Sequence, residues 1–152
     1  DTGASALAVI PDCAGPGPPH AATGGEGGDV AVTDFRRVAA GQTARATVWH
    51  TAPGKGHTSA VAAAAAVSGE GRRQLLVTGC RDGDMRVWGA GKGEQVQEVK
   101  CAHEKHTFLN PKGGGLSTQA AITSLHGLDG GVLSTGGDGI VRLHRCNPSW
   151  AR

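Results

Sequence analysis

The sequence predicts an all-β protein, specifically a partial β-propeller of about three blades. Its glycine content, its lack of helical periodicity and an internal repeat carry this prediction. Glycine occupies 26 of the 152 positions, and glycine destabilises helix interiors. Outside residues 60–67, no long stretch of strong helix formers carries a periodic apolar face. The composition therefore favours many short strands joined by turns.

The third observation is an internal repeat. Three segments share an apolar strand that ends in a small hydroxyl residue and glycine, a tight polar turn, and an alternating strand: residues 23–34, 78–89 and 135–145. Each segment is predicted to be a β-hairpin. Gly28, Gly83 and Gly139 mark the turns, and their spacing exceeds the roughly 40–45 residues of a usual propeller repeat. The excess is expected to lie in loops.

Further strands are predicted on both sides of these hairpins. Upstream candidates lie at residues 6–10, 60–67 and 120–125, and downstream candidates lie at 44–49 and 96–100. Four strands in each unit match the plan of a propeller blade. The alanine run within residues 60–67 favours helix by intrinsic propensity, but its place in the repeat favours a strand.

The repeat divides the chain into a degenerate first unit (residues 1–50), a well-formed second unit (51–102), and a loop insertion with a degenerate terminal unit (103–152). In the third unit only residues 146–152 remain for an outer strand, and Pro148 interrupts them. Propellers close with about four to eight blades. Further blades are therefore expected, from a longer polypeptide or from another chain.

Charge and cysteine usage narrow the function classes. The formal net charge of +2 is too small to predict a nucleic-acid partner. The four cysteines, Cys13, Cys80, Cys101 and Cys146, form no C-x-x-C pair, which favours reduced thiols in the cytoplasm. No segment approaches the roughly 18 apolar residues of a membrane span, so no direct membrane insertion is expected.

The second unit resembles the WD-repeat family. Gly56-His57 is similar to the family's Gly-His pair, Thr78 to its inner-strand hydroxyl residue, Asp82 to its turn acid and Trp88 to its strand tryptophan. The resemblance implies a structural tetrad in which His57 bridges Asp82 and Thr78, while the Trp88 indole donates to Thr78. Such a network would stabilise a blade because it satisfies several buried polar groups at once.

The outer units depart from this pattern. The first unit keeps Thr23 and Asp34 but has Thr33 in the tryptophan position. The third unit keeps Thr135 and Asp138, has His144 in the tryptophan position, and offers His103 as its histidine. A weaker hydrogen-bond network is therefore expected in both outer units.

A narrower resemblance is to the C-terminal propeller of the DmX-like (rabconnectin) family. It rests on residues 75–88, 96–106, 113–115 and 133–139, which place a tryptophan-bearing blade, a histidine-containing strand exit, a glycine loop and a terminal blade without tryptophan in one order. This resemblance implies a scaffold that helps assemble the vacuolar proton ATPase. It also implies partners among the subunits of that enzyme and its assembly complex, and a peripheral location on endosomal or vacuolar membranes.

Other functions stay open as alternatives. A binding module of an unrelated ciliary, ribosomal or ubiquitin-ligase assembly would carry the same blade motifs. A hydrolase would use His57, Thr78 and Asp82 as base, nucleophile and orienting acid, and the prediction is instead that the protein is not an enzyme and needs no cofactor. Cys101, His103 and His106 lack a fourth ligand at zinc-like spacing, so no metal is expected.

Partner contacts are predicted at exposed features outside the tetrad. Trp49 and Trp150 would anchor a partner if they face solvent. The loop expected from Glu104 to Thr118 is the predicted variable contact surface.

Overall fold

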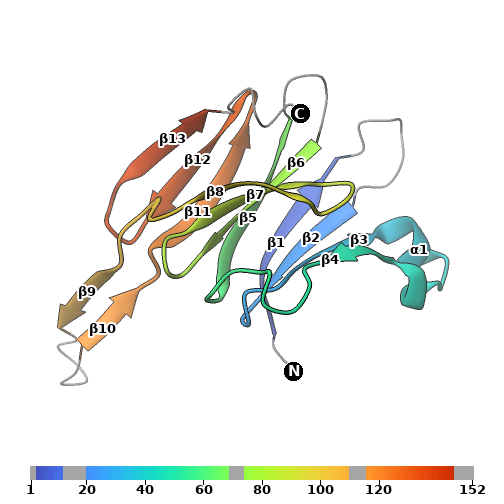
Figure 1. The fold of residues 1–152 in the computed structure, drawn as a ribbon, viewed down its shortest axis with the longest axis horizontal. Coiled ribbons are helices and arrows are strands. Elements are labelled where there is room, and N and C mark those ends of the chain that lie inside the picture. The colour runs from blue at the N-terminus through green and yellow to red at the C-terminus, as the bar shows by residue number, and fades with distance from the viewer. Residues whose placement is uncertain (1–2, 12–19, 69–73, 110–115, 146–152) are drawn as a thin grey trace.

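The computed structural model describes residues 3–11, 20–68, 74–109 and 116–145, and it is built from antiparallel sheets with little helix (Figure 1). Sheet 1 contains β1 (Ala4–Ile10), β2 (His20–Gly25), β3 (Val30–Asp34) and β4 (Thr47–His50). Sheet 2 contains β5 (Val61–Ser68), β6 (Gln74–Cys80), β7 (Met85–Gly89) and β8 (Gln95–Val99). Sheet 3 contains β11 (Ile122–Leu128), β12 (Gly131–Gly136) and β13 (Val141–Arg145). The predicted all-β class is confirmed.

The fourth sheet is a separate hairpin of β9 (His106–Leu109) and β10 (Leu116–Gln119), which lies between sheets 2 and 3 in the sequence. Figure 1 shows it projecting away from the three larger sheets at the lower left. The loop predicted over Glu104 to Thr118 therefore contains two paired strands.

The three larger sheets lie next to one another through their first strands. Strand β5 contacts both β1 and β11, so sheet 2 lies between the other two (Figure 1). Within each sheet the strands pair in sequence order, with a register shift near the start of the first strand. The described sheets do not form a closed ring, and the larger propeller stays a prediction.

Two hydrophobic clusters fill the spaces between the sheets. Side chains alternate between the faces of a strand, and we name the faces by the residues that they carry. The A face bears Val30 and Val32 in sheet 1, Met85 and Val87 in sheet 2, and Val141 and Leu143 in sheet 3. The B face bears Leu7 and Val9 in sheet 1, Leu76 and Trp88 in sheet 2, and Leu125 and Val132 in sheet 3.

Each cluster joins the A face of one sheet to the B face of the next. Val30 and Val32 pack with Leu76 and Trp88 in one cluster. In the other, Met85 and Val87 pack with Leu125 and Val132 in the same arrangement. Sheet 2 is thus buried on both faces, which explains why residues 75–80 of β6 are all buried and do not alternate between buried and exposed.

Local elements depart from the prediction near the end of sheet 1. Asp34 is the last residue of β3 and also caps the helix α1 (Phe35–Ala39), where its carboxylate accepts from the Arg36 amide at 2.9 Å. A 3₁₀ turn at Thr43–Arg45 follows, so β4 begins later than the strand predicted for residues 44–49. The alanine-rich β5 is a strand, because both of its faces pack against neighbouring sheets.

No helix in the described part of the chain is long and apolar enough to cross a membrane.

Candidate functional site

A glycine turn in one sheet positions the histidine that precedes the next large sheet in the sequence. Gly28 and Gly83 have φ values of +86° and +97°, which glycine adopts without strain. Their carbonyl oxygens accept hydrogen bonds from the backbone that follows, from the His57 amide at 2.8 Å and from the Ala102 amide, also at 2.8 Å. Equivalent backbone hydrogen bonds to a turn glycine therefore set the positions of His57 and His103.

The ring of His57 belongs to a buried hydrogen-bond network in sheet 2. Its Nε2 lies 2.7 Å from Thr78 Oγ1, and the Trp88 indole N–H donates to the same hydroxyl oxygen at 2.8 Å. All three side chains are buried. The network joins β6 and β7 to the segment that enters β5.

Asp82 is not part of this network. Its carboxylate forms an ion pair with Lys105, and its backbone amide donates to Ser59 Oγ at 3.1 Å. His57 Nδ1 is buried and has no hydrogen-bond partner among the described residues. The expectation that His57 bridges Asp82 and Thr78 is therefore wrong in its Asp82 half.

A fuller network lies in sheet 3. His103 Nδ1 is 3.0 Å from each carboxylate oxygen of Asp138, and its Nε2 is 2.7 Å from Ser134 Oγ. Ser134 Oγ in turn lies 2.8 Å from His144 Nε2. A carboxylate only accepts, so His103 donates through Nδ1. In the neutral His103 ring Nε2 then accepts from the Ser134 hydroxyl, whose oxygen is left to accept from His144 Nε2.

The hydroxyl in this network is that of Ser134 and not that of Thr135, which corrects the sequence alignment. Thr78 lies opposite Arg86, two positions along from the Leu76 and Trp88 pair. Ser134 has the same relation to Val132 and His144. Thr135 lies on the opposite face of β12, where its hydroxyl is 2.7 Å from Ser124 Oγ.

Sheet 1 has no equivalent network among its described residues. Thr23 occupies the position of Thr78, since it pairs with Ala31 in the same register, and no described side chain bonds to it. Thr33 stands where sheet 2 has Trp88. Asp34 faces the helix, as described above, and so is not a member of a tetrad.

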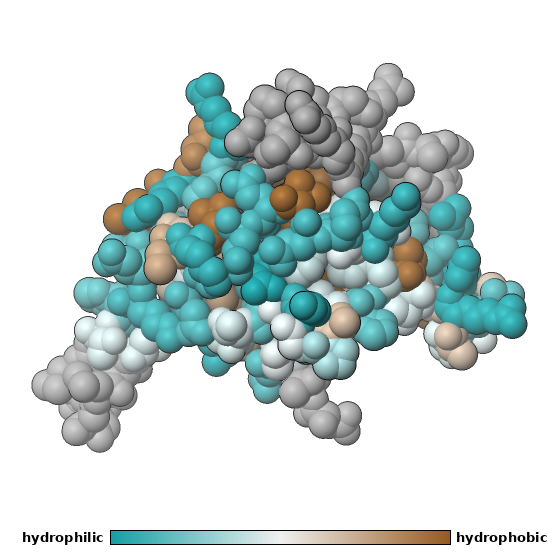
Figure 2. All heavy atoms as spheres, viewed as in Figure 1, coloured by the Kyte–Doolittle hydropathy of each residue, from teal (hydrophilic) through white to brown (hydrophobic). Residues whose placement is uncertain are grey.

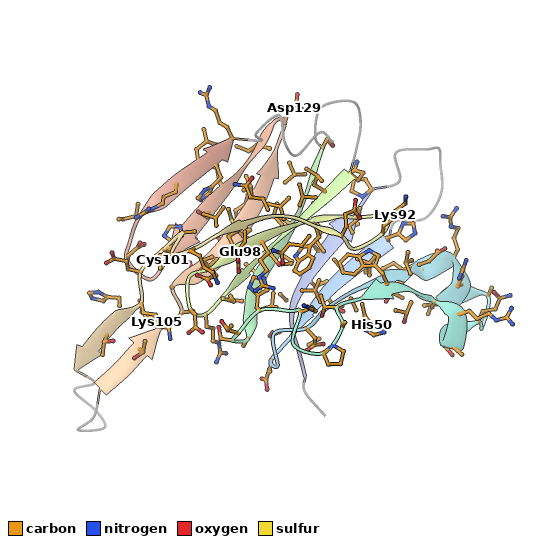
Figure 3. All side chains as sticks on the ribbon, in the orientation of Figure 1. His50, Lys92, Glu98, Cys101, Lys105 and Asp129 are labelled. Atoms are coloured by element: carbon orange, nitrogen blue, oxygen red, sulfur yellow. The ribbon has the colours of Figure 1, made fainter. Side chains whose placement is uncertain are left out.

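Arg86 is a contributor that the sequence did not single out. Its guanidinium donates to the carbonyl oxygens of Lys55 and Gly56 at 2.8 and 2.7 Å and pairs with Glu98 at 3.0 Å. It therefore holds the backbone immediately before His57. Figure 3 shows Glu98 on the strand beside it.

The environment of these groups shifts their titration. Burial lowers the pKa of His57 from 6.5 to about 4. Burial also lowers the pKa of His144, and the neighbouring His103 and Arg142 add to this effect. Burial alone would raise the pKa of Asp138, but the Ile140 amide and His103 hold it below its usual value. His57 is therefore neutral at pH 7 and acts as an uncharged hydrogen-bonding group.

The predicted partner anchor Trp49 is a packing residue. Its indole donates to the Ala90 carbonyl at 2.7 Å, and its ring centre lies 6.1 Å from that of Trp88. It therefore bridges sheets 1 and 2 and does not project towards a partner. The other predicted anchor, Trp150, lies outside the described residues.

The arrangement of Asp138, His103 and Ser134 has the residue types and the order of a hydrolase triad. Ser134 is fully buried, however, and its oxygen already contacts two histidines. Thr78 is likewise fully buried between His57 and Trp88. A nucleophile needs a free approach for its substrate, so these hydroxyls are placed to hold strands together.

Metal ligands do not gather in the described ranges. No group of three or more His, Cys, Asp or Glu side chains there is arranged to hold an ion. Cys101 is exposed, and the His103 ring is engaged by Asp138 and Ser134. Figure 3 places Cys101 where the chain leaves sheet 2, with Lys105 further along.

Comparison with known proteins identifies no family. No family model matches the chain, and no curated protein matches it. Among solved structures, the chain is similar to one described as the crystal structure of the computationally designed Ika4 protein, with 18% identity and a TM-score of 0.48. That match covers 97% of this chain and 93% of the designed one.

Proposed function

We propose that this chain is a segment of a WD-repeat β-propeller that acts as a protein-interaction scaffold. The observation that carries the proposal is the Ser134 hydroxyl, which is fully buried and bonded to both His103 and His144. A polar network placed in this way serves packing specificity and leaves no group for chemistry. The His57, Thr78 and Trp88 contacts repeat the arrangement in sheet 2.

In this proposal binding takes place on loops and projecting elements, because the interior between the sheets is filled by side chains. The β9 and β10 hairpin is the favoured contact surface. It stands away from the sheets (Figure 1), and Thr107 and Thr118 on it are exposed and 3.3 Å apart. A projecting hairpin presents side chains and a strand edge without disturbing the core.

A narrower proposal names the partner class. The resemblance of residues 75–88, 96–106, 113–115 and 133–139 to the DmX-like family supports a role in assembling the vacuolar proton ATPase, on the cytoplasmic side of endosomal or vacuolar membranes. A scaffold of an unrelated ciliary, ribosomal or ubiquitin-ligase assembly is the competing form of the same proposal.

Affinity purification of the full-length protein tests both levels. We expect proton-ATPase or assembly-complex subunits to be recovered with the parent, and to be lost when residues 106–119 are replaced by a short glycine and serine linker. The matched control is Val38→Glu on α1, which changes an exposed apolar residue far from the hairpin. Recovery of a different assembly with the parent would overturn the narrower proposal.

Substitutions that remove the two buried hydroxyls test the scaffold proposal itself. Ser134→Ala and Thr78→Ala should lower the stability of the fold. Neither the parent nor these variants should hydrolyse ester or peptide substrates. A hydrolysis rate that the parent shows and that Ser134→Ala abolishes, with the fold retained, would overturn the proposal.

A further inference from the structure

The outer face of sheet 3 repeats a surface that is buried twice elsewhere in the chain. Val30 and Val32 in sheet 1, and Met85 and Val87 in sheet 2, occupy the same register positions as Val141 and Leu143. The first four are at most 1% exposed, because the next sheet covers them. Val141 and Leu143 are 63% and 53% exposed.

The opposite end of the chain has the complementary surface. In sheet 3, Leu125 on the B face is 6% exposed because it packs against sheet 2. Leu7 has the same place in β1, since it pairs with Thr23 as Leu125 pairs with Ser134. Leu7 is 67% exposed, and Val9 beside it is 56% exposed. Within the described residues, one A face and one B face are thus left uncovered.

The uncovered A face also contains a hollow at one end of sheet 3. A hollow of about 320 Å³ is lined by Leu128, Asp129, Gly130, Gly131, Leu143 and Arg145. Figure 3 marks Asp129 at this end of sheet 3, and Figure 2 shows apolar atoms at the margin where Figure 1 places β13. Side chains of a docking sheet could enter this hollow and bury Leu128 and Leu143.

We propose that the A face of sheet 3 docks against the B face of sheet 1 of a second copy of this chain, head to tail. The two interfaces within the chain are the template, because each joins an A face to a B face through the same strand positions. A head-to-tail contact of this kind is heterologous, so copies can close a ring. The inference rests on the packing of the sheets and not on the proposed partner or family.

Sedimentation velocity of the 152-residue chain across a concentration series tests the proposal. The parent should show species at multiples of the 15.3 kDa monomer mass. Leu143→Glu removes the A face and Leu7→Glu removes the B face, and each change alone should give a monomer. Val38→Glu is the matched control, since its side chain lies on α1 and should leave the association unchanged.

A mixture of the two variants distinguishes head-to-tail contact from other contacts. The Leu143→Glu copy keeps its B face and the Leu7→Glu copy keeps its A face, so together they should form a one-to-one heterodimer. Far-UV circular dichroism of each variant verifies that the sheets are intact.

Three results would overturn the proposal. A parent that stays monomeric at the highest concentration would show that a second copy does not cover these faces, and would point to further sheets of a longer polypeptide. Loss of association in Leu143→Glu but not in Leu7→Glu would indicate a symmetric contact of one face with itself. Folded variants that fail to form the mixed dimer would likewise exclude the head-to-tail contact.

Discussion

His103 Nε2 lies 2.7 Å from Ser134 Oγ. The amide of the preceding residue, Ala102, donates to the Gly83 carbonyl in a turn of the preceding sheet at 2.8 Å. One residue therefore couples two sheets, through its neighbouring backbone on one side and its ring on the other. His57 has the same relation to Gly28 and Thr78. The stacking of the sheets is thus supported by polar contacts as well as by the apolar clusters.

Removing the Thr78 hydroxyl should destabilise the protein. Thr78→Val keeps the shape of the side chain but leaves His57 Nε2 and the Trp88 indole without their partner. Each buried polar group left unpaired costs roughly 1–3 kcal/mol, and two groups lose their partner, so we expect the free energy of unfolding, measured by urea titration, to fall by at least about 2 kcal/mol. The matched control is Thr23→Val, which changes the equivalent position of sheet 1. Equal stabilities of the two variants would contradict the network.

The two turn aspartates should differ in their effect. Asp138→Ala leaves the buried His103 Nδ1 without an acceptor and should cost roughly 1–3 kcal/mol. Asp82→Ala removes an ion pair with the half-exposed Lys105, and surface pairs contribute about 0–1 kcal/mol. Thermal and urea unfolding of both variants measures the difference. Equal losses would mean that Asp82 serves His57 after all.

Acid should destabilise the fold through His57. Burial lowers its pKa in the folded protein to about 4 from 6.5, so the unfolded chain binds the proton first. This contribution is absent above about pH 6.5 and grows as the pH falls towards 4, reaching on the order of 3 kcal/mol. Unfolding free energies measured at a series of pH values should show this fall. His57→Gln should reduce the slope, and an unchanged slope would contradict the assignment.

The turn glycines should respond differently to alanine. Both Gly83 and Gly139 have positive φ, at 97° and 75°, which costs an alanine roughly 1–2 kcal/mol. A Cβ on Gly139 meets open space, whereas one on Gly83 meets the His103 carbonyl and the Ala121 side chain. Gly83→Ala should therefore lose clearly more stability than Gly139→Ala. Similar melting temperatures would show that the Gly83 turn does not pack against the His103 segment.

Much of the fold could be predicted from the sequence because the sequence repeat corresponds to a repeated structural unit. The glycine turns and the alternating strands marked the hairpins that became β2 and β3, β6 and β7, and β12 and β13. The repeat also decided the alanine run, since β5 is held as a strand by packing on both faces. The helix α1 was missed, although Asp34 is a typical helix-capping residue.

The site was harder to predict because it depends on which face of a strand a residue occupies. Ser134 and Thr135 are adjacent hydroxyl residues, and aligning on the Thr-Gly pair selected the wrong one. Pairing Val132 with His144 as the counterpart of Leu76 and Trp88 would have selected Ser134. The partner of Asp82 could not be predicted, because Lys105 reaches it from the segment between two sheets.

His103, from the segment between two sheets, contacts the buried Ser134 hydroxyl of the later sheet, and the two side chains should stabilise the fold jointly. A double-mutant cycle on His103→Ala and Ser134→Ala, read as free energies of unfolding at pH 7, measures this coupling directly. We expect a coupling energy of about 1–2 kcal/mol. Changes that add to within about 0.3–0.5 kcal/mol would contradict it.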